Sequence, residues 1–131
     1  MYRVEIINHG SSKFTAKTKD YEFTIDTKGE GCTPPDTLLA SLGSCIGVYL
    51  RKYAEGSRIS LPEFTVTAEG ELSKESPVSF RLINVSIDLK GADLDDRRKQ
   101  ALLSFIKNCP IHNTLEHSPE INIQFREGGK V

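Results

Sequence analysis

The stretch that most constrains the fold is residues 33–56, TPPDTLLASLGSCIGVYLRKYAEG. Thr33 can cap a helix N-terminus, the two prolines after it suit the first helical positions, and Asp36 complements the helix dipole. Residues 38–50 carry no charge and place apolar side chains on every side of a helix. A helix that is apolar all round is a buried helix. The sequence therefore predicts a central buried helix that ends near Gly56.

One stripe of this helix carries a cysteine. Leu38, Leu42, Cys45 and Tyr49 follow one another at helical spacing, so Cys45 lies midway along the helix. A thiol attacks only as the thiolate, and about 3% of a free cysteine is ionised at pH 7. Because a mid-helix position gains little from the helix dipole, activation would have to come from tertiary neighbours. Two interpretations of Cys45 stay open, a nucleophile or a small core residue, and Leu42 and Tyr49 are either substrate-pocket residues or core.

Length and composition limit the classes of protein. The 131 residues fit one domain, 1–131, and the apolar fraction of 37% is low enough to favour an oligomer. A net charge of -1 without a basic stripe argues against nucleic acid as a partner. No apolar run reaches the roughly 20 residues that span a bilayer, and MYRVEIINHG lacks the apolar core of a signal peptide. We therefore expect a cytoplasmic protein with no membrane partner, whose three cysteines are free thiols or redox groups.

The rest of the chain alternates between strands and helices. Short connections predict an antiparallel meander of three strands at the N-terminus, and two further strands and a second helix follow the central helix. The second helix should be capped by Asp93, a last strand should follow it, and residues 128–131 should fray. The strands expected are at residues 2–8, 13–18, 21–25, 64–69, 80–90 and 120–126. This order is typical of an α+β fold.

Cys109 differs from Cys45 in its local setting. It stands before Pro110, where a short helix can begin and free N–H groups would favour a thiolate. Together with Cys45 it suggests a redox pair, while Cys32, in a glycine-containing loop, is a bystander or an alternative partner. Cys109 and His112 have the spacing of half a metal site, but nothing supplies the other half, so no metal and no cofactor are expected.

Two motifs resemble one known family. The run TPPDTLLASLGSCIGVYLRKYA is similar to the central-helix signature of the OsmC/Ohr family, the osmotically inducible and organic hydroperoxide resistance proteins. The later CPIHNTL resembles the second-cysteine motif of that family, and DYEFTID resembles the segment that leads into its central helix. The resemblance covers nearly the whole chain and implies an intertwined α+β homodimer in which two central helices are buried together.

The resemblance also implies a reaction. Cys45 would be the peroxidatic nucleophile of a thiol peroxidase, an antioxidant hydroperoxide reductase of the oxidative stress response, and Cys109 would be its resolving cysteine. An organic hydroperoxide would be the substrate, and a dithiol of lipoyl or other type would be the reductant. The alternative implied is a non-enzymatic dimer of this fold that binds a small apolar ligand between its central helices.

The sequence departs from the family pattern around the first cysteine. In the hydroperoxide-resistance branch an arginine and a glutamate activate that cysteine, whereas here the glutamate position falls on Pro35, beside Asp36. The N-terminal meander offers lysines in place of the arginine. The hypothesis is that Lys13 or Lys17 reaches over the site and that Asp36 holds it there. The missing arginine favours the ligand-binding alternative, and the retained cysteine pair favours the peroxidase.

Overall fold

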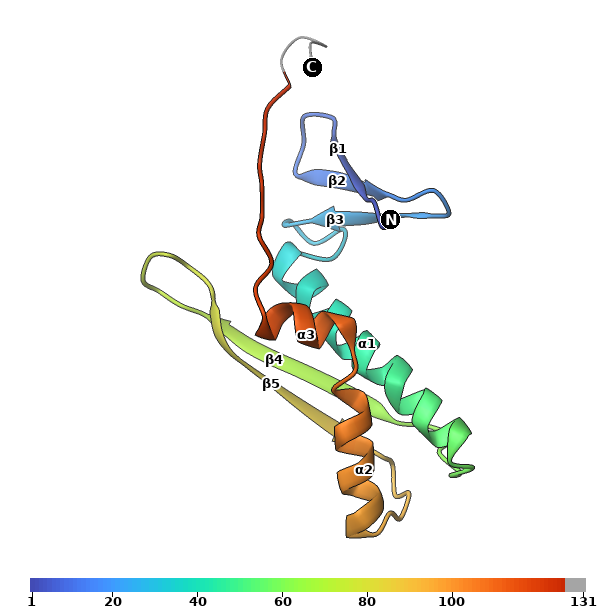
Figure 1. Ribbon diagram of the computed structural model, residues 1–131. Coiled ribbons are helices and arrows are strands. Elements are labelled where there is room, and N and C mark those ends of the chain that lie inside the picture. Colours follow the sequence, from blue (N-terminus) through green and yellow to red (C-terminus); the bar gives the residue numbers. More distant parts are fainter. Residues whose placement is uncertain (127–131) are drawn as a thin grey trace.

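The computed structural model describes residues 1–126, so the expected fraying of residues 128–131 lies outside the described residues. It confirms the α+β class, with antiparallel strands before and after a long central helix (Figure 1). The elements in chain order are β1 (Glu5–Asn8), β2 (Lys13–Lys17), β3 (Glu22–Asp26), α1 (Pro34–Gly56), β4 (Thr65–Leu72), β5 (Phe80–Asp88), α2 (Asp96–Ile106) and α3 (Pro110–Glu116).

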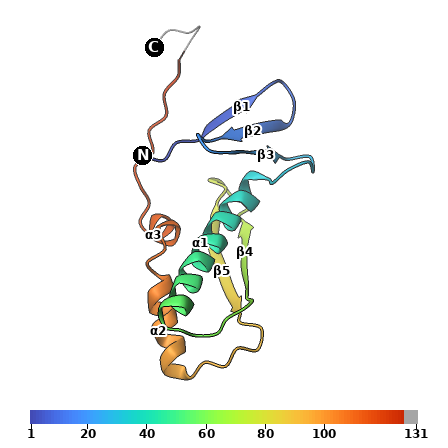
Figure 2. The same cartoon turned by 90° about the vertical axis from the view of Figure 1, so that its right-hand side faces the viewer.

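The central helix α1 begins and ends where the sequence predicts. The side chain of Thr33 accepts a hydrogen bond from the backbone N–H of Asp36 at 3.2 Å, which is the expected N-cap. In the two views, the β4–β5 hairpin lies along one side of α1 and the helices α2 and α3 lie along the other (Figures 1 and 2). The helix is therefore the element against which the C-terminal half of the chain packs.

The strands form two separate antiparallel sheets. The N-terminal meander has the order β1-β2-β3 and lies beyond the first turn of α1, and the second sheet is the β4–β5 hairpin (Figure 1). The loop between β3 and α1 returns closely to the meander. At Gly31 a Cβ atom would lie 2.6 Å from the carbonyl oxygen of Thr24, so the close approach of the loop to β3 requires glycine there.

The apolar core lies around α1. Its buried residues come from α1, from the segments before β4 and α2, from α2 and from the start of α3. They are Leu42, Ile46, Leu50, Ala54, Leu61, Leu94, Leu102, Ile106 and Cys109. In the single chain α1 is not covered on every side, since the side chain of Val48 is 51% exposed. The prediction of a fully buried helix thus holds for one face of α1 in this chain.

Two predictions about the C-terminal half are wrong for the single chain. Asp95, not Asp93, caps α2, because the Asp95 side chain accepts a hydrogen bond from the N–H of Arg98 at 2.8 Å. The segment 120–126 forms no strand, since none of the described strands lies beside it to form a hydrogen-bonded ladder. Its apolar side chains stay exposed, and Phe125 is 92% exposed.

None of the helices within residues 1–126 combines the length and the apolar character that a membrane crossing demands.

Candidate active site

Cys109 is the N-cap of α3, so its thiol lies beside the free backbone N–H groups of the first helical turn. Its Sγ accepts a hydrogen bond from the backbone N–H of His112 at 3.3 Å, and Pro110 occupies the first helical position. The side chain is completely buried, with 0% of its surface exposed. The predicted helix start after Cys109 is confirmed, and Cys109 is fixed both by packing and by this hydrogen bond.

Cys45 packs against the core cluster that contains Cys109. The side chain of Cys109 and the backbone N–H of Ile111, in the first turn of α3, both shift the pKa of the Cys45 thiol, which places them near it. Both cysteines are free thiols, and Cys45 is partly exposed whereas Cys109 is buried. The structure thus brings together the two cysteines that the sequence singles out, from positions 64 residues apart in the numbering of the chain.

The environment of Cys45 disfavours its ionised form. Burial is the main reason that the pKa of the Cys45 thiol is raised, and the hydrogen bond and charge of Cys109 raise the pKa further. Two groups act in the opposite direction: the N–H of Ile111 and the charge of Lys52 lower this pKa. The thiolate therefore depends on donors and cations that face it from α3 and from α1 itself.

Lys52 is the cation that the sequence analysis missed. Its Nζ lies 4.7 Å from the centroid of the Tyr49 ring, and the Tyr49 ring lies 5.9 Å from that of Phe105 on α2. The helical spacing from Cys45 to Tyr49 and on to Lys52 is +4 and then +3, which places the three side chains along one face of α1. That spacing was the available signal, because it continues the stripe of Cys45 past its last apolar residue.

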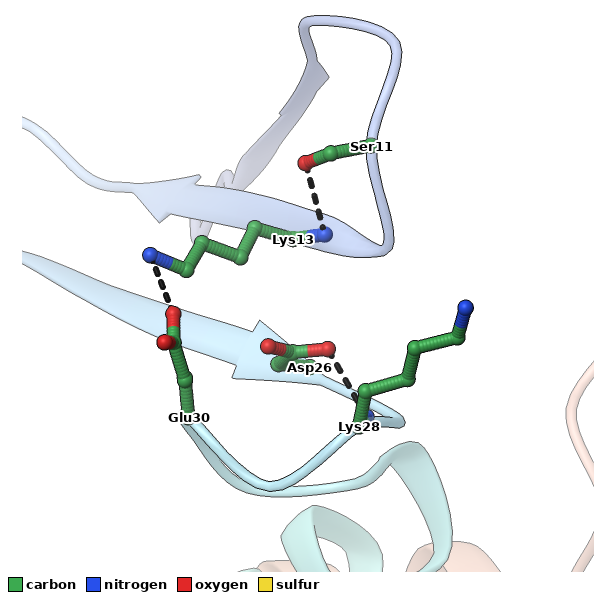
Figure 3. Close-up of polar contacts among 5 residues, drawn as sticks. All are labelled: Ser11, Lys13, Asp26, Lys28 and Glu30. Atoms are coloured by element: carbon green, nitrogen blue, oxygen red, sulfur yellow. Dashed lines mark hydrogen bonds and ion pairs between the residues drawn. The ribbon is translucent and has the colours of Figure 1, made fainter.

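The lysines and the carboxylate proposed to activate Cys45 lie elsewhere in this chain. Lys13 on β2 forms an ion pair with Glu30 in the loop before α1 (Figure 3). The hydrogen bond between these two side chains is the main reason that the pKa of Lys13 is raised. Lys17 is exposed at the far end of β2. Asp36 does not hold Lys13 as expected. It precedes Cys45 by nine residues, about half a turn out of phase, and lies on the side of α1 that faces β4.

A buried carboxylate lies in the meander, apart from the two cysteines. Asp26 is 2% exposed, and its Oδ1 accepts a hydrogen bond from the backbone N–H of Lys28 at 2.8 Å (Figure 3). This hydrogen bond is the main reason that the pKa of the Asp26 carboxyl is lowered, and Ser12 and the charge of Lys13 lower it further. These contacts hold the loop after β3 in place, so the polar cluster serves the meander rather than the thiols.

A large apolar groove runs along another face of α1. Its volume is about 910 Å³, and it lies between α1, β5 and the helices α2 and α3. Leu42 lines it, as expected for a pocket residue, whereas Tyr49 packs against Phe105 on α2. The other apolar lining residues include Pro34, Leu38, Ile46, Leu82, Ile83, Val85, Leu103 and Leu115.

The remaining candidates stay apart from the thiol pair. Cys32 is exposed, and its backbone forms an isolated parallel β-bridge with Ile25 of β3, next to the Asp26 loop. The ring of His112 lies 3.6 Å from the carboxylate of Glu116, and His117 is the C-cap of α3. Within residues 1–126, no three His, Cys, Asp or Glu side chains gather in a way that could hold a metal ion.

Comparison with known proteins identifies the family. A family model described as OsmC-like protein matches residues 27–124. The chain is 23% identical to the hydroperoxide reductase of Mycoplasma genitalium over 129 residues, which cover 93% of this chain and 92% of that protein.

Solved structures show the same fold. The OsmC-like protein of Mycoplasma pneumoniae matches with a TM-score of 0.77 at 21% identity, over 90% of this chain and 89% of that one. An organic hydroperoxide resistance protein of Elizabethkingia anophelis matches with a TM-score of 0.62 at 17% identity, over 90% of this chain and 91% of that one. The family model spans most of the chain and includes both thiols of the site, and the chain therefore belongs to the OsmC-like protein family.

Proposed function

We propose that this protein is a thiol peroxidase that reduces organic hydroperoxides through Cys45 and Cys109. The observation that carries the proposal is the juxtaposition of the two thiols, with Cys45 of α1 packed against the core cluster that contains Cys109 at the start of α3. A sulfenic acid formed on Cys45 would therefore have the thiol of Cys109 as its neighbour. The names of the relatives, a hydroperoxide reductase and an organic hydroperoxide resistance protein, point to the same chemistry.

The difference in exposure supports this division of roles. The partly exposed Cys45 can meet a peroxide, whereas Cys109 is fully buried. The Cys45 thiolate attacks the terminal oxygen of the hydroperoxide, the O–O bond breaks, and the alkoxide takes a proton and leaves as the alcohol. Cys109 then attacks the sulfur of the Cys45 sulfenic acid, which releases water and leaves a disulfide. A dithiol of lipoyl or other type restores both thiols by exchange and is itself oxidised to its disulfide.

A stoichiometric assay tests this proposal. The reduced protein is mixed with one equivalent of cumene hydroperoxide or of hydrogen peroxide, and peroxide loss and the protein's mass are followed. We expect faster loss of the organic peroxide and a Cys45–Cys109 peptide. Cys45→Ser should consume no peroxide, and Cys109→Ser should stop at a sulfenic acid that dimedone traps. The matched control is Cys32→Ser, which should react like the parent. A main product that contains Cys32, or equal consumption by Cys45→Ser, would reject the assignment.

One observation favours the alternative function, a dimer that binds a small apolar ligand without turnover. The raised pKa of Cys45 leaves little thiolate at neutral pH, which suits a packing residue better than a nucleophile. If neither peroxide is consumed while an apolar probe binds the reduced protein, this alternative stands. If turnover depends on Cys45, the peroxidase stands.

We further propose that the protein works as a homodimer. The apolar groove, the exposed face of α1 at Val48 and the exposed segment 120–126 together leave more apolar surface uncovered than a soluble monomer usually carries. A second copy that covers them would bury an interface of the permanent type, above about 2,000 Å². Sedimentation at micromolar concentration should show a dimer.

A charge placed in the apolar groove tests whether this groove forms the dimer interface. Leu103→Glu places a charge on an exposed lining residue of α2 and should produce monomers, whereas Arg98→Glu, on the same helix and outside the groove lining, should not. A folded parent monomer at micromolar concentration would contradict the dimer.

A further inference from the structure

The cysteine pair leaves one chemical requirement unexplained, namely the cation that offsets the burial of Cys45. A thiolate in a largely apolar setting needs a positive charge or N–H donors nearby. Ile111 supplies one N–H from α3. Of the two lysines that the sequence offered from the meander, Lys13 pairs with Glu30 and Lys17 is exposed at the far end of β2. Within the described chain, a cation for Cys45 is therefore expected on the helices around the two thiols.

Lys52 has the right position for this role. Its Nζ lies 4.7 Å from the Tyr49 ring centroid, although Tyr49 stands three residues earlier in the helix. The side chain must therefore run back along α1 toward the helix N-terminus, which is the direction that helical side chains favour. Cys45 is the next residue of the same stripe, one turn beyond Tyr49. The ammonium group is thus held beside Tyr49, on the stripe of α1 that carries Cys45.

The aromatic ring fixes the lysine rather than leaving it free in solvent. A cation above the face of an aromatic ring is attracted by the ring quadrupole. Tyr49 is itself held by the Phe105 ring at 5.9 Å, so it offers Lys52 a fixed support. None of the ion pairs found among residues 1–126 involves Lys52, whereas those of Lys13 and Lys90 join neighbouring carboxylates.

We propose that Lys52 is the cation that stabilises the Cys45 thiolate, and that the Tyr49 ring is the residue that positions it. This inference rests on the proposed peroxidase function for its biological meaning, but not for its chemistry. In the described chain, the ionisable groups that act on Cys45 are Cys109 and Lys52, and the charge of Lys52 lowers the pKa of the thiol. His112, also on α3, directs its ring toward Glu116 and Asn113.

The test is the pH dependence of Cys45 alkylation in the reduced full chain. Iodoacetamide modification is measured between pH 6 and pH 10 in a Cys32→Ser background, and the Cys45 peptide is quantified by mass spectrometry. Lys52→Met should raise the apparent pKa of Cys45 by about 0.5, as expected for the loss of one partly screened charge. Lys52→Arg should keep the parent value because it keeps the charge. The matched control is Lys99→Met, which removes an exposed lysine from another helix, α2.

The role of Tyr49 is tested by a mutant cycle. Tyr49→Phe keeps a ring and should keep the parent profile, while Tyr49→Leu should raise the apparent pKa of Cys45. Lys52→Met should then raise the apparent pKa of Cys45 by less in the Tyr49→Leu background than in the parent. Helical circular dichroism checks that each variant is folded, and 1 M salt should narrow the difference between parent and Lys52→Met, because screening weakens a partly exposed charge.

The outcomes separate this inference from the function. If Lys52→Met alkylates with the parent profile, the inference fails even where peroxide turnover depends on Cys45. If Lys52→Met raises the apparent pKa while no variant consumes peroxide, the cation is established and the peroxidase proposal fails alone. Equal shifts for Lys52→Met and Lys99→Met would also overturn the inference, because they would report net charge rather than position.

Discussion

The two ends of the molecule are stabilised by opposite means. In the N-terminal meander the buried residues are Ala16 and Asp26, and polar contacts of Lys13, Glu30 and Lys28 join its strands to the following loop (Figure 3). Around α1 the buried residues are almost all apolar, and the two thiols lie among them. Charged side chains are therefore concentrated in the meander, where few residues are buried. The pKa of the Asp26 carboxyl is lowered by donors, whereas the pKa of the Cys45 thiol is raised by burial.

The largest effect is expected in the core around α1. Leu50 is fully buried, and Leu50→Ala should lower the free energy of unfolding by about 2–5 kcal/mol, because it removes buried methyl groups and leaves a cavity. Phe23→Ala, on a partly exposed residue of the meander, should cost about 1 kcal/mol. Urea unfolding measures both. Equal losses would show that the meander has an apolar core of comparable weight.

A second test measures how burial affects the ionisation of the Cys45 thiol. Because burial raises the pKa of Cys45, the thiol form persists at neutral pH, and the rate of alkylation should rise about tenfold per pH unit from pH 6 to pH 8. It should still be rising at pH 9. Peptide-resolved iodoacetamide labelling of the reduced parent measures this rate, with the exposed Cys32 as an internal reference. A rate that is flat above pH 7 would mean that the thiolate is already formed.

A third test concerns the meander, where stability should be lost as the pH falls. The folded-state pKa of Asp26 lies below its unfolded value, so its stabilising contribution is present above about pH 4 and is lost as the pH falls through the folded-state pKa. Asp26→Asn should lower the thermal midpoint at pH 7 by about 3 °C and should flatten its decline below pH 4. Parallel acid profiles for parent and variant would show that the carboxylate contributes nothing.

The smallest effect is expected at Lys13. The ammonium group is exposed and paired with Glu30, so Lys13→Met should leave the alkylation profile of Cys45 at the parent value within error. An upward change in the apparent pKa of Cys45 would restore the hypothesis that the meander activates the thiol. In that case, the lysine would have to approach Cys45 from a second copy of the chain.

Local chemistry decided which parts of this architecture could be predicted. The limits of α1 follow from Thr33, the prolines and Gly56, and the start of α3 follows from Cys109 before Pro110. The local settings of Cys45 and Cys109 suggest a redox pair, and the resemblance implies their roles, but no spacing in the sequence brings two helices together. The missed residue is Lys52, because a lysine near a helix end looks solvated until its neighbouring ring is placed. The misplaced one is Lys13, whose partner Glu30 lies in a loop that has no sequence periodicity.

The exposed segment 120–126 has a consequence for the life of the newly made chain. Ile121, Ile123 and Phe125 alternate with amides and carry no charge between them, which is the composition that aggregates as cross-β structure when a strand finds no partner. Glu120 and Arg126 stand on either side as charged gatekeepers. An unassembled chain thus carries an aggregation-prone segment together with the two charges that oppose its aggregation. A neutral substitution of Glu120 or Arg126 should lower the protein concentration at which the chain begins to precipitate.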